Sequence, residues 1–391
     1  MAEARIYFDW NAGAPLNAAA RAAIVDWLGR PGNGSSVHAE GRAAHAAIET
    51  ARRQVARLVG AEGKAVTFCS GGTEAANTVL TPDWTLFGKP FAIDRLLVSA
   101  VEHPAVLKGG RFAADRVETI PVDGNGLIDL GWLAGRLDEL AAGGQRALVS
   151  VMLANNETGV IEPIAELARL VHGHGGLVHS DAVQAAGKVA VDIETLDVDV
   201  LTLSAHKIGG AQGVGAIVRG RNGFAFAPLL TGGGQEQGGR AGTENVAGIA
   251  AFGVAAEQAR SELADMAAVA ARRDRLAALV RQTAPQVVIF GEAVERLPNT
   301  LCLAVPGTAA ETAVIAFDLA GVALSSGSAC SSGKVKASHV LKAMAVDEGL
   351  ARAGLRLSIG PATTDAEIER FGLISDNVFR AMTKLHGTRV A

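Results

Sequence analysis

Cysteine is scarce in this sequence. The 391 residues include only three cysteines, Cys69, Cys302 and Cys330, and they lie far apart along the chain. A disulfide framework needs cysteines in pairs, and a structural zinc site needs ligands at short, regular spacing. We therefore expect reduced thiols and no intrinsic metal site.

The sequence also lacks any cluster of lysine and arginine. Its formal net charge is -4, whereas proteins that bind nucleic acid or anionic membranes usually carry basic patches. The first residues show no basic region followed by an apolar run, and no stretch approaches the roughly 18 uninterrupted apolar residues of a spanning helix. These absences favour a cytoplasmic protein that binds small molecules and other proteins rather than nucleic acid or membrane.

Hydrophobic residues, by contrast, are abundant. They make up 49% of the chain against 19% charged residues, which is enough to build a large core. Short β-type runs alternate with longer alanine-rich segments of helical period, a pattern typical of an α/β fold with a mostly parallel sheet and helices on both faces. The strands expected in this part of the chain span residues 65–69, 96–100, 147–153, 176–179, 200–203 and 215–218.

A change of pattern marks the second part of the chain. Residues 255–282 contain no strand-like run and predict one extended helix that leads out of the first domain. The last helix is expected to open at Thr364, because Glu367 follows at the spacing of a capping box. Between them we expect strands at 287–290, 300–305 and 355–359 and a helix at 312–320. The predicted organisation is a large domain, 13–258, and a smaller α+β domain formed by 1–12 and 259–391.

Polar residues follow five of the predicted strands. Because the carboxyl ends of parallel strands meet at one edge of a sheet, where ligands bind, these residues are expected to share one crevice. They are Ser70-Gly71-Gly72-Thr73, Glu102-His103, Asn155, Asp181 and Ser204-Ala205-His206-Lys207.

Three of these features together predict pyridoxal 5'-phosphate, which carries an aldehyde, a ring nitrogen and a phosphate. The 70–73 turn offers backbone N–H groups to a phosphate, although similar turns are common as purely structural connections. Asp181 follows an apolar run that carries its carboxylate to the crevice, where a protonated pyridine nitrogen is a candidate partner and helix capping is the alternative. Lys207 ends another apolar run, and a desolvated lysine amine is what Schiff-base chemistry requires.

Other residues of the crevice complete this interpretation. Thr73, Ser204 and His206 are expected at the phosphate. His103 has the right place to stack on the ring, although a lone histidine is more often structural. Gln184 is expected to reach the ring hydroxyl.

Two further residues suggest a reaction on an amino acid. Residues 325–333 are small and include two glycines, which predicts a mobile loop that presents the thiol of Cys330 as a nucleophile. Cys69 and Cys302 lie within β-type runs and are expected to be core residues. Arg356 alternates with apolar residues of a strand, where its guanidinium group could bind a substrate carboxylate through two parallel hydrogen bonds. The alternative is a solvent-facing salt bridge.

With these residues in view, the sequence resembles the cysteine desulfurases, within the class V aminotransferase group of fold-type I enzymes that use pyridoxal phosphate. The resemblance covers nearly the whole chain. It rests on Ser70-Gly71-Gly72-Thr73-Glu74, Asn155-Asn156-Glu157-Thr158-Gly159, His179-Ser180-Asp181-Ala182-Val183-Gln184, Ser204-Ala205-His206-Lys207, Gly232-Gly233-Gly234-Gln235-Glu236, Arg240-Ala241-Gly242-Thr243-Glu244-Asn245 and Ser325-Ser326-Gly327-Ser328-Ala329-Cys330.

The resemblance assigns a role to each site residue. Lys207 becomes the Schiff-base lysine and Cys330 the residue that forms a persulfide and could transiently contact a nascent iron–sulfur cluster. Thr243 is expected to reach the phosphate held by the neighbouring subunit of a homodimer. The expected cofactor ligands are Gly72, Thr73, His103, Asn155, Asp181, Gln184, Ser204, His206, Lys207 and Thr243. Arg356, helped by Asn33 and Asn155, is expected to bind the substrate carboxylate, and His103 to carry protons.

The sequence departs from the family pattern at three places. Residues 9–15 lack a usual threonine pair, residues 208–213 lack a usual tyrosine, proline and lysine, and residues 237–239 lack a usual arginine. None of these differences removes an expected catalytic group.

The activity implied is conversion of L-cysteine to L-alanine, with the sulfur passed to Cys330 for iron–sulfur cluster assembly or other thio-cofactor synthesis. A scaffold or other sulfur-acceptor protein would be the partner. The alternatives are a selenocysteine lyase or related lyase, an aminotransferase, a sulfur-carrying assembly scaffold, and a generic phosphate-binding α/β protein. Cys330 favours the desulfurase over the aminotransferase, because transamination has no use for a thiol.

Overall fold

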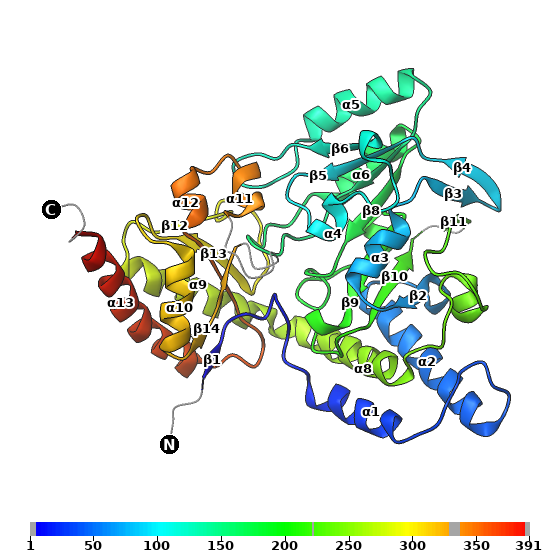
Figure 1. Ribbon diagram of the computed structural model, residues 1–391, viewed down its shortest axis with the longest axis horizontal. Coiled ribbons are helices and arrows are strands. Elements are labelled where there is room, and N and C mark those ends of the chain that lie inside the picture. Colours follow the sequence, from blue (N-terminus) through cyan, green and yellow to red (C-terminus); the bar gives the residue numbers. More distant parts are fainter. Residues whose placement is uncertain (1–4, 221–222, 328–336, 388–391) are drawn as a thin grey trace.

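The computed structural model describes residues 5–220, 223–327 and 337–387, with side chains up to residue 382. Its centre is a sheet of seven strands in the order β2-β10-β9-β8-β7-β5-β6 (Figure 1). These strands are β2 (Val66–Cys69), β5 (Arg95–Ser99), β6 (Val117–Ile120), β7 (Ala147–Ser150), β8 (Leu177–Asp181), β9 (Val200–Ser204) and β10 (Gly215–Arg219). β5 to β9 pair in parallel, and β10 runs antiparallel to both β2 and β9. The predicted α/β class and its six strands are therefore confirmed, and β6 adds a strand that the pattern did not predict.

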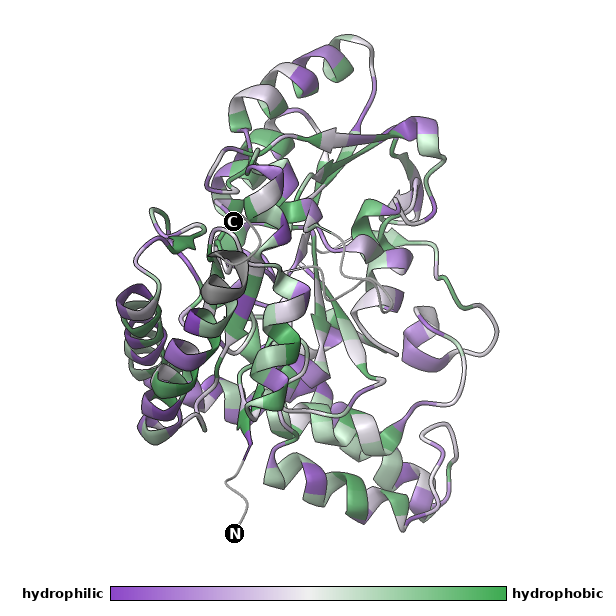
Figure 2. Cartoon of the chain, turned by 60° about the vertical axis from the view of Figure 1, so that its left-hand side comes forward, coloured by the Kyte–Doolittle hydropathy of each residue, from purple (hydrophilic) through white to green (hydrophobic). Residues whose placement is uncertain are grey.

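Successive residues of the central strands belong to two different cores. In β7, Leu148 packs with one cluster and Val149 with the other, and Leu177 and Val178 divide in the same way in β8. Side chains of a strand point alternately to its two faces, so the sheet is covered on both. The strands are coloured mostly as hydrophobic in Figure 2, as expected of strands buried on both faces.

Helices on the two faces account for these cores. One face packs on α2 (Ala39–Leu58), α5 (Leu130–Ala142), α6 (Ile164–Gly173) and α8 (Val246–Glu262). The other packs on α3 (Gly72–Val79) and α4 (Pro104–Leu107), and on a small sheet of β3 (Asp83–Leu86), β4 (Lys89–Ala92) and β11 (Phe224–Phe226). Helix α1 (Ala18–Leu28) lies along α8.

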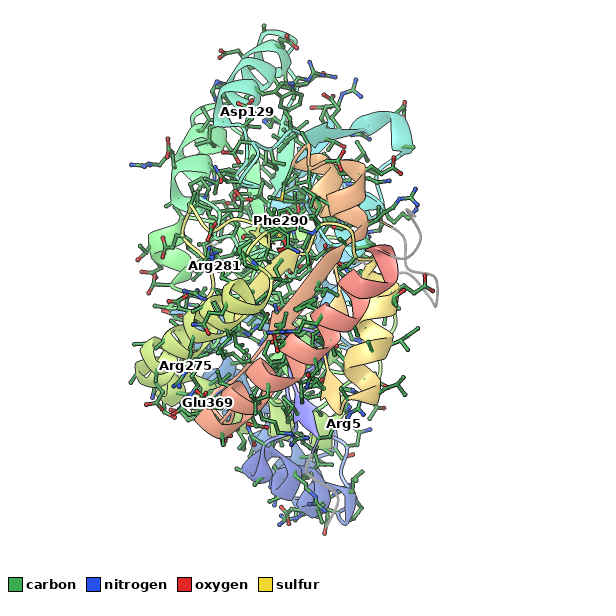
Figure 3. All side chains as sticks on the ribbon, turned by 90° about the vertical axis from the view of Figure 1, so that its left-hand side faces the viewer. Arg5, Asp129, Arg275, Arg281, Phe290 and Glu369 are labelled. Atoms are coloured by element: carbon green, nitrogen blue, oxygen red, sulfur yellow. The ribbon has the colours of Figure 1, made fainter. Side chains whose placement is uncertain are left out.

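A second sheet and its helices form a separate core. The sheet has the order β12-β13-β16-β15, all antiparallel, with β12 (Val288–Ile289), β13 (Thr300–Ala304), β15 (Ser325–Ser326) and β16 (Gly354–Ser358). It packs on α9 (Met266–Thr283), α10 (Ala310–Leu319) and α13 (Asp365–Gly387). Arg275 of α9 and Glu369 of α13 form an ion pair where these helices meet (Figure 3).

The N-terminal strand belongs to this second core. β1 (Ile6–Tyr7) pairs in parallel with β14 (Val322–Ala323), and Ile6 and Phe8 are fully buried there. Short helices α11 (His339–Ala343) and α12 (Glu348–Arg352) lie towards the first sheet. The domain limits expected from the sequence, at residues 12 and 258, stay a prediction.

The expected single helix over 255–282 is wrong in detail. The chain forms α8 from Val246, a 3-10 turn at Leu263–Asp265, and then α9. Helix α8 begins earlier because Asn245 caps it, its side chain accepting a hydrogen bond from Gly248 N at 3.1 Å. The interruption falls where the helical path leaves one core for the other, since α8 packs with the first and α9 with the second.

The capping box at the final helix is confirmed. Thr364 N donates to Glu367 Oε2 at 2.8 Å, and Glu367 N donates back to Thr364 Oγ1 at 3.2 Å. Among the described residues, no helix has the length and apolar character needed to cross a membrane.

Candidate active site

A cavity of about 370 Å³ opens at the carboxyl ends of the central strands. Its walls come from segments far apart in the sequence, including the N-terminal segment and β16 of the second sheet. Nine residues predicted from the sequence line it: Gly72, Thr73, His103, Asp181, Gln184, Ser204, His206, Lys207 and Arg356. The predicted crevice is thus formed within one chain.

Lys207 reaches the cavity from a 3-10 turn that directly follows β9. Its Nζ donates to the backbone carbonyl of Asn11 at 2.6 Å and to that of Ala12 at 2.9 Å. Both acceptors are neutral, so they hold the amine without neutralising it. The sequence did not predict a role for Asn11, because Asn11 binds the lysine through its backbone carbonyl.

Asp181 ends β8 and faces the same cavity. Burial raises the pKa of Asp181 to about 6, against hydrogen bonds from Val183 and Thr202 and the charge of Lys207 that lower it. A carboxylate in such a place gains from a cation bound beside it. The protonated ring nitrogen of pyridoxal phosphate meets this requirement.

The phosphate end of the predicted site is equally well formed. Gly72 and Thr73 open α3, an eight-residue helix, and a helix start presents N–H groups to an anion. Strand β10 passes so near that a Cβ added at Gly215 would lie 2.6 Å from Gly71 Cα. Ser204 and His206 line the same cavity. Burial, followed by the charges of Lys207 and Lys188, lowers the pKa of His206 to about 4, so its ring is neutral at neutral pH.

His103 is held in one orientation at the start of α4. Its Nδ1 accepts a hydrogen bond from Ala105 N at 3.1 Å, which leaves the ring proton of the neutral form on Nε2. Burial, and then the charges of Lys207 and His339, lowers the pKa of His103. A neutral, oriented imidazole on the cavity wall suits both stacking and proton transfer.

Arg356 is buried, with 3% of its surface exposed, and lines the cavity. Its guanidinium donates to Asp9 Oδ1 at 2.7 Å and to the carbonyl of Asn156 at 3.0 Å, while its Nε has no hydrogen-bond partner in the described structure. The alternative of a solvent-facing salt bridge is therefore excluded. A fixed guanidinium on the cavity wall can receive the carboxylate of an amino acid.

Gln184 belongs to a chain of hydrogen bonds that leads to Lys207. The buried Lys188 donates from Nζ to Gln184 Oε1 at 2.7 Å, and Gln184 Nε2 donates to Asn11 O at 3.0 Å, the carbonyl that also binds Lys207. Burial, with the charges of Lys207 and Arg356, holds the pKa of Lys188 well below its usual range. The sequence analysis missed Lys188, although a lysine four residues after Gln184, in an alanine- and glycine-rich stretch, was a usable signal. The role of Gln184 at a ring hydroxyl stays a prediction.

Three predicted residues, Asn33, Asn155 and Thr243, do not line this cavity. Asn155 closes its own turn, since its Oδ1 accepts from Glu157 N and Thr158 N and its Nδ2 donates to Val101 O. Asn33 is exposed and binds Ser35 N at 2.9 Å. Thr243 is exposed and lines a separate hollow. Cys330, with its loop, lies outside the described residues, so all four roles stay predictions.

The other two cysteines are core residues, as predicted. Cys69 is 7% exposed and Cys302 is fully buried. Burial raises the pKa of Cys69 to about 12 and that of Cys302 further. Neither thiol is available as a thiolate nucleophile near neutral pH. The described residues contain no group of three or more His, Cys, Asp or Glu side chains that could hold a metal ion.

The comparisons decide the family. The class-V aminotransferase model matches residues 6–371, and a cysteine desulfurase of Cereibacter sphaeroides is 42% identical over 94% of this chain and 93% of its own. This chain belongs to the cysteine desulfurases of the class-V aminotransferase family. Enzymes of this family use pyridoxal phosphate, and the lysine, aspartate and helix start described above fit that cofactor.

Solved structures agree with this assignment. A NifS-like protein from Rickettsia africae superposes with a TM-score of 0.86 at 32% identity, covering 96% of this chain and 99% of its own. A structure described as SspA in complex with cysteine superposes with a TM-score of 0.72 at 26% identity, covering 92% of this chain and 100% of its own. The fold of this desulfurase is therefore shared along almost its whole length.

Replacing Asp181 with asparagine is expected to change how the stability of the cofactor-free protein depends on pH. The pKa of about 6 lies above the ordinary 3.8, so the folded chain binds this proton more tightly than the unfolded chain. The free energy of unfolding therefore falls as the pH rises from about 4 to about 6. Asp181→Asn should avoid this loss, which amounts to at most roughly 3 kcal/mol.

Thermal unfolding of both cofactor-free proteins across this pH range measures the difference. The variant should be the more stable apoprotein above about pH 6 and should bind pyridoxal phosphate more weakly. Equal stability at every pH would contradict the burial of this carboxyl.

Proposed function

We propose that this protein removes the sulfur of L-cysteine, releases L-alanine, and carries the sulfur as a persulfide on Cys330. A partner protein would then accept the sulfur for iron–sulfur cluster assembly or other thio-cofactor synthesis. The observation that supports this most strongly is the place of Arg356. This residue shares the cavity with Lys207 and also lies on the strand beside which the Cys330 segment begins.

The start of that segment can be traced residue by residue. In β15, Ser325 pairs with Arg356 and Ser326 with Leu355, and Gly327 N donates to Gly354 O at 3.1 Å. Cys330 follows three residues later, and three residues of chain can span about 10 Å. We therefore expect the Cys330 thiol to reach an amino acid whose carboxylate is bound by Arg356.

Bound pyridoxal phosphate would supply an electron sink for the α-carbon of the substrate. The residues that would hold it are Gly72, Thr73, Ser204 and His206 at the phosphate, Asp181 at the ring nitrogen, His103 at the ring face and Lys207 at the aldehyde. Lys207 would then move the α-proton, and His103 would take the thiol proton of the substrate or of Cys330.

The sulfur step balances without an external oxidant. The Cys330 thiolate attacks the substrate sulfur, an S–S bond forms and the C–S bond breaks. The electron pair of the C–S bond stays with the carbon skeleton, which takes up a proton and leaves as alanine. Each substrate molecule therefore leaves one sulfur atom on the protein.

Product analysis tests this function directly. Purified protein given L-cysteine and a thiol reductant should release alanine and sulfide in equal amounts. A keto acid product would indicate an aminotransferase, and turnover of selenocysteine alone would indicate a selenocysteine lyase. Bound cofactor without turnover would favour a sulfur-carrying scaffold, and failure to bind the cofactor would leave a generic phosphate-binding protein.

A homodimer is part of this proposal, because Thr243 is exposed and lies in a hollow separate from its own cavity. We expect its hydroxyl to bind the phosphate in the neighbouring subunit. Thr243→Ala should then weaken cofactor binding about tenfold, as expected for a hydrogen bond to a charged group, and Thr243→Ser should restore it. Equilibrium titration of the apoproteins measures this.

Mixed dimers separate action across the interface from action within one chain. A dimer of one Lys207→Ala chain and one Thr243→Ala chain should keep one fully normal site if Thr243 acts across the interface. It should keep none if Thr243 serves its own chain. Unchanged cofactor affinity in the Thr243→Ala homodimer would refute the assignment altogether.

A further inference from the structure

The two ends of the segment that carries Cys330 lie beside the same buried side chain, the carboxylate of Glu157. The segment leaves the described structure after Gly327, where an added Cβ would lie 2.9 Å from Glu157 Oε2. It returns at Ala337 and Ser338, and Ser338 Oγ donates to this Oε2 at 2.5 Å. Glu157 is 3% exposed and Ser338 is 2% exposed, so water does not compete for this contact.

Glu157 lies directly next to the wall of the active-site cavity in the sequence. Its backbone N donates to Asn155 Oδ1 at 2.8 Å within the Asn155–Gly159 turn. The preceding residue, Asn156, lines the cavity, and its carbonyl accepts hydrogen bonds from Arg356 at 3.0 Å and from Asn11 Nδ2 at 3.2 Å. One turn therefore contacts the expected substrate-binding arginine and both ends of the Cys330 segment.

We propose that Glu157 is a positioning residue that fastens both ends of the Cys330 segment to the substrate-binding wall of the cavity. The inference rests on the proposed function, in which Cys330 must meet the substrate sulfur. The two ends of the segment lie close together, since a Cβ added at Gly327 would lie 3.3 Å from Ser338 Cβ. Fixing that one point fixes where the intervening residues start and finish.

The surroundings of Glu157 make this attachment sensitive to pH. Burial raises the pKa of Glu157 to about 7, against the hydrogen bond from Ser338 and the charge of Arg356 that lower it. Among the described residues, Cys302 of β13 also faces it, while His339, next to Ser338, bonds instead to the carbonyl of Glu102 at 2.9 Å.

As the pH rises through 7, Glu157 becomes a carboxylate, and the hydrogen bond from Ser338 becomes charge-assisted and stronger. The stability contribution runs the other way, because a raised carboxyl pKa makes the folded state less stable as its proton is lost.

A purely structural role is the competing explanation. Ser338 Oγ also accepts a hydrogen bond from Leu341 N at 3.1 Å and so caps α11. If Glu157 merely supports that cap, its replacement should alter thermal stability and leave the chemistry of Cys330 unchanged. The reactivity of the Cys330 thiol therefore separates the two explanations.

Two variants disturb the attachment from opposite sides. Glu157→Gln keeps the shape and removes the charge, and Gly327→Ala places a methyl group against Glu157 Oε2. Matched controls exist for both: Glu162→Gln, another buried glutamate, whose pKa burial raises to about 8, and Gly135→Ala, in α5, where the added Cβ meets no heavy atom within 4 Å. The cofactor-loaded enzyme is used throughout.

Two rates are measured: alkylation of Cys330 by iodoacetamide and persulfide formation in a single turnover with L-cysteine. We expect both disturbing variants to change the alkylation rate several-fold and to slow persulfide formation about tenfold, the effect of losing a charged hydrogen bond. The KM for cysteine should stay within about twofold. In the wild type, the rate of persulfide formation should rise between about pH 6 and about pH 8 as Glu157 loses its proton. This part of the rise should be absent in Glu157→Gln.

The inference is overturned if both variants alkylate Cys330 and form the persulfide at the rates of their controls. It is also overturned if they lose cysteine binding and sulfur transfer in equal proportion, because Glu157 would then support only the cavity wall. Alkylation does not depend on catalysis. A changed alkylation rate in a protein that makes no persulfide would therefore refute the proposed function and leave the attachment intact.

Discussion

Cys330→Ser is expected to abolish sulfur transfer while leaving cofactor binding intact. None of the residues expected to hold the cofactor needs the Cys330 thiol, so the change in the absorption spectrum on adding L-cysteine should persist. Serine stays protonated near neutral pH and cannot hold a persulfide. Alanine and sulfide production should therefore fall together, by about a thousandfold or more, as for other removed nucleophiles.

The buried cysteines provide the controls for this variant. Cys69→Ala and Cys302→Ala should keep most of the activity, because burial keeps both thiols protonated. Full sulfide release by Cys330→Ser would overturn the role of the loop. Loss of the spectral response as well would show that Cys330 is structural.

Lys207→Ala should abolish both turnover and the covalent attachment of the cofactor. The amine of Lys207 is held at the cavity wall by the carbonyls of Asn11 and Ala12, where we expect the aldehyde of the cofactor to lie. Without it, borohydride should no longer fix the cofactor to the protein, and turnover should fall by about a thousandfold or more.

Lys188→Met is the control that makes this result specific. Lys188 is the nearby rival, since it is buried, has a lowered pKa and is linked to Lys207 through Gln184 and Asn11. Its replacement should leave the borohydride-fixed linkage in place. A linkage that survives Lys207→Ala and disappears in Lys188→Met would move the Schiff base to the second lysine.

Sequence patterns predicted the residues that act through their own side chains at strand ends. Asp181 and Lys207 each follow an apolar run, and a charged residue after such a run points to a buried, functional place. The strands themselves were visible because they are buried on both faces and therefore continuously apolar. The interruption between α8 and α9 was not visible, because it depends on which core each helix contacts rather than on local composition.

Apart from Lys188, the residues that sequence analysis missed act through long-range contacts. Asn11 and Asn156 contribute backbone carbonyls, which no side-chain pattern reveals. Glu157 stands in a motif that supported the family resemblance, yet its contact with Ser338 joins residues 181 positions apart. Arg356 could be either exposed or buried on alternation alone, and only its pairing with Asp9 and its place at the cavity exclude the exposed alternative.

The most direct test of the central claim follows the sulfur atom itself. The wild-type enzyme is incubated with L-cysteine carrying isotopically labelled sulfur, without reductant, and its peptides are analysed by mass spectrometry. We expect one labelled sulfur atom on the peptide that contains Cys330, and one alanine formed for each sulfur atom bound. A reductant added afterwards should release this sulfur. Labelled sulfur on Cys69 or Cys302, or alanine formed with no labelled peptide, would contradict it.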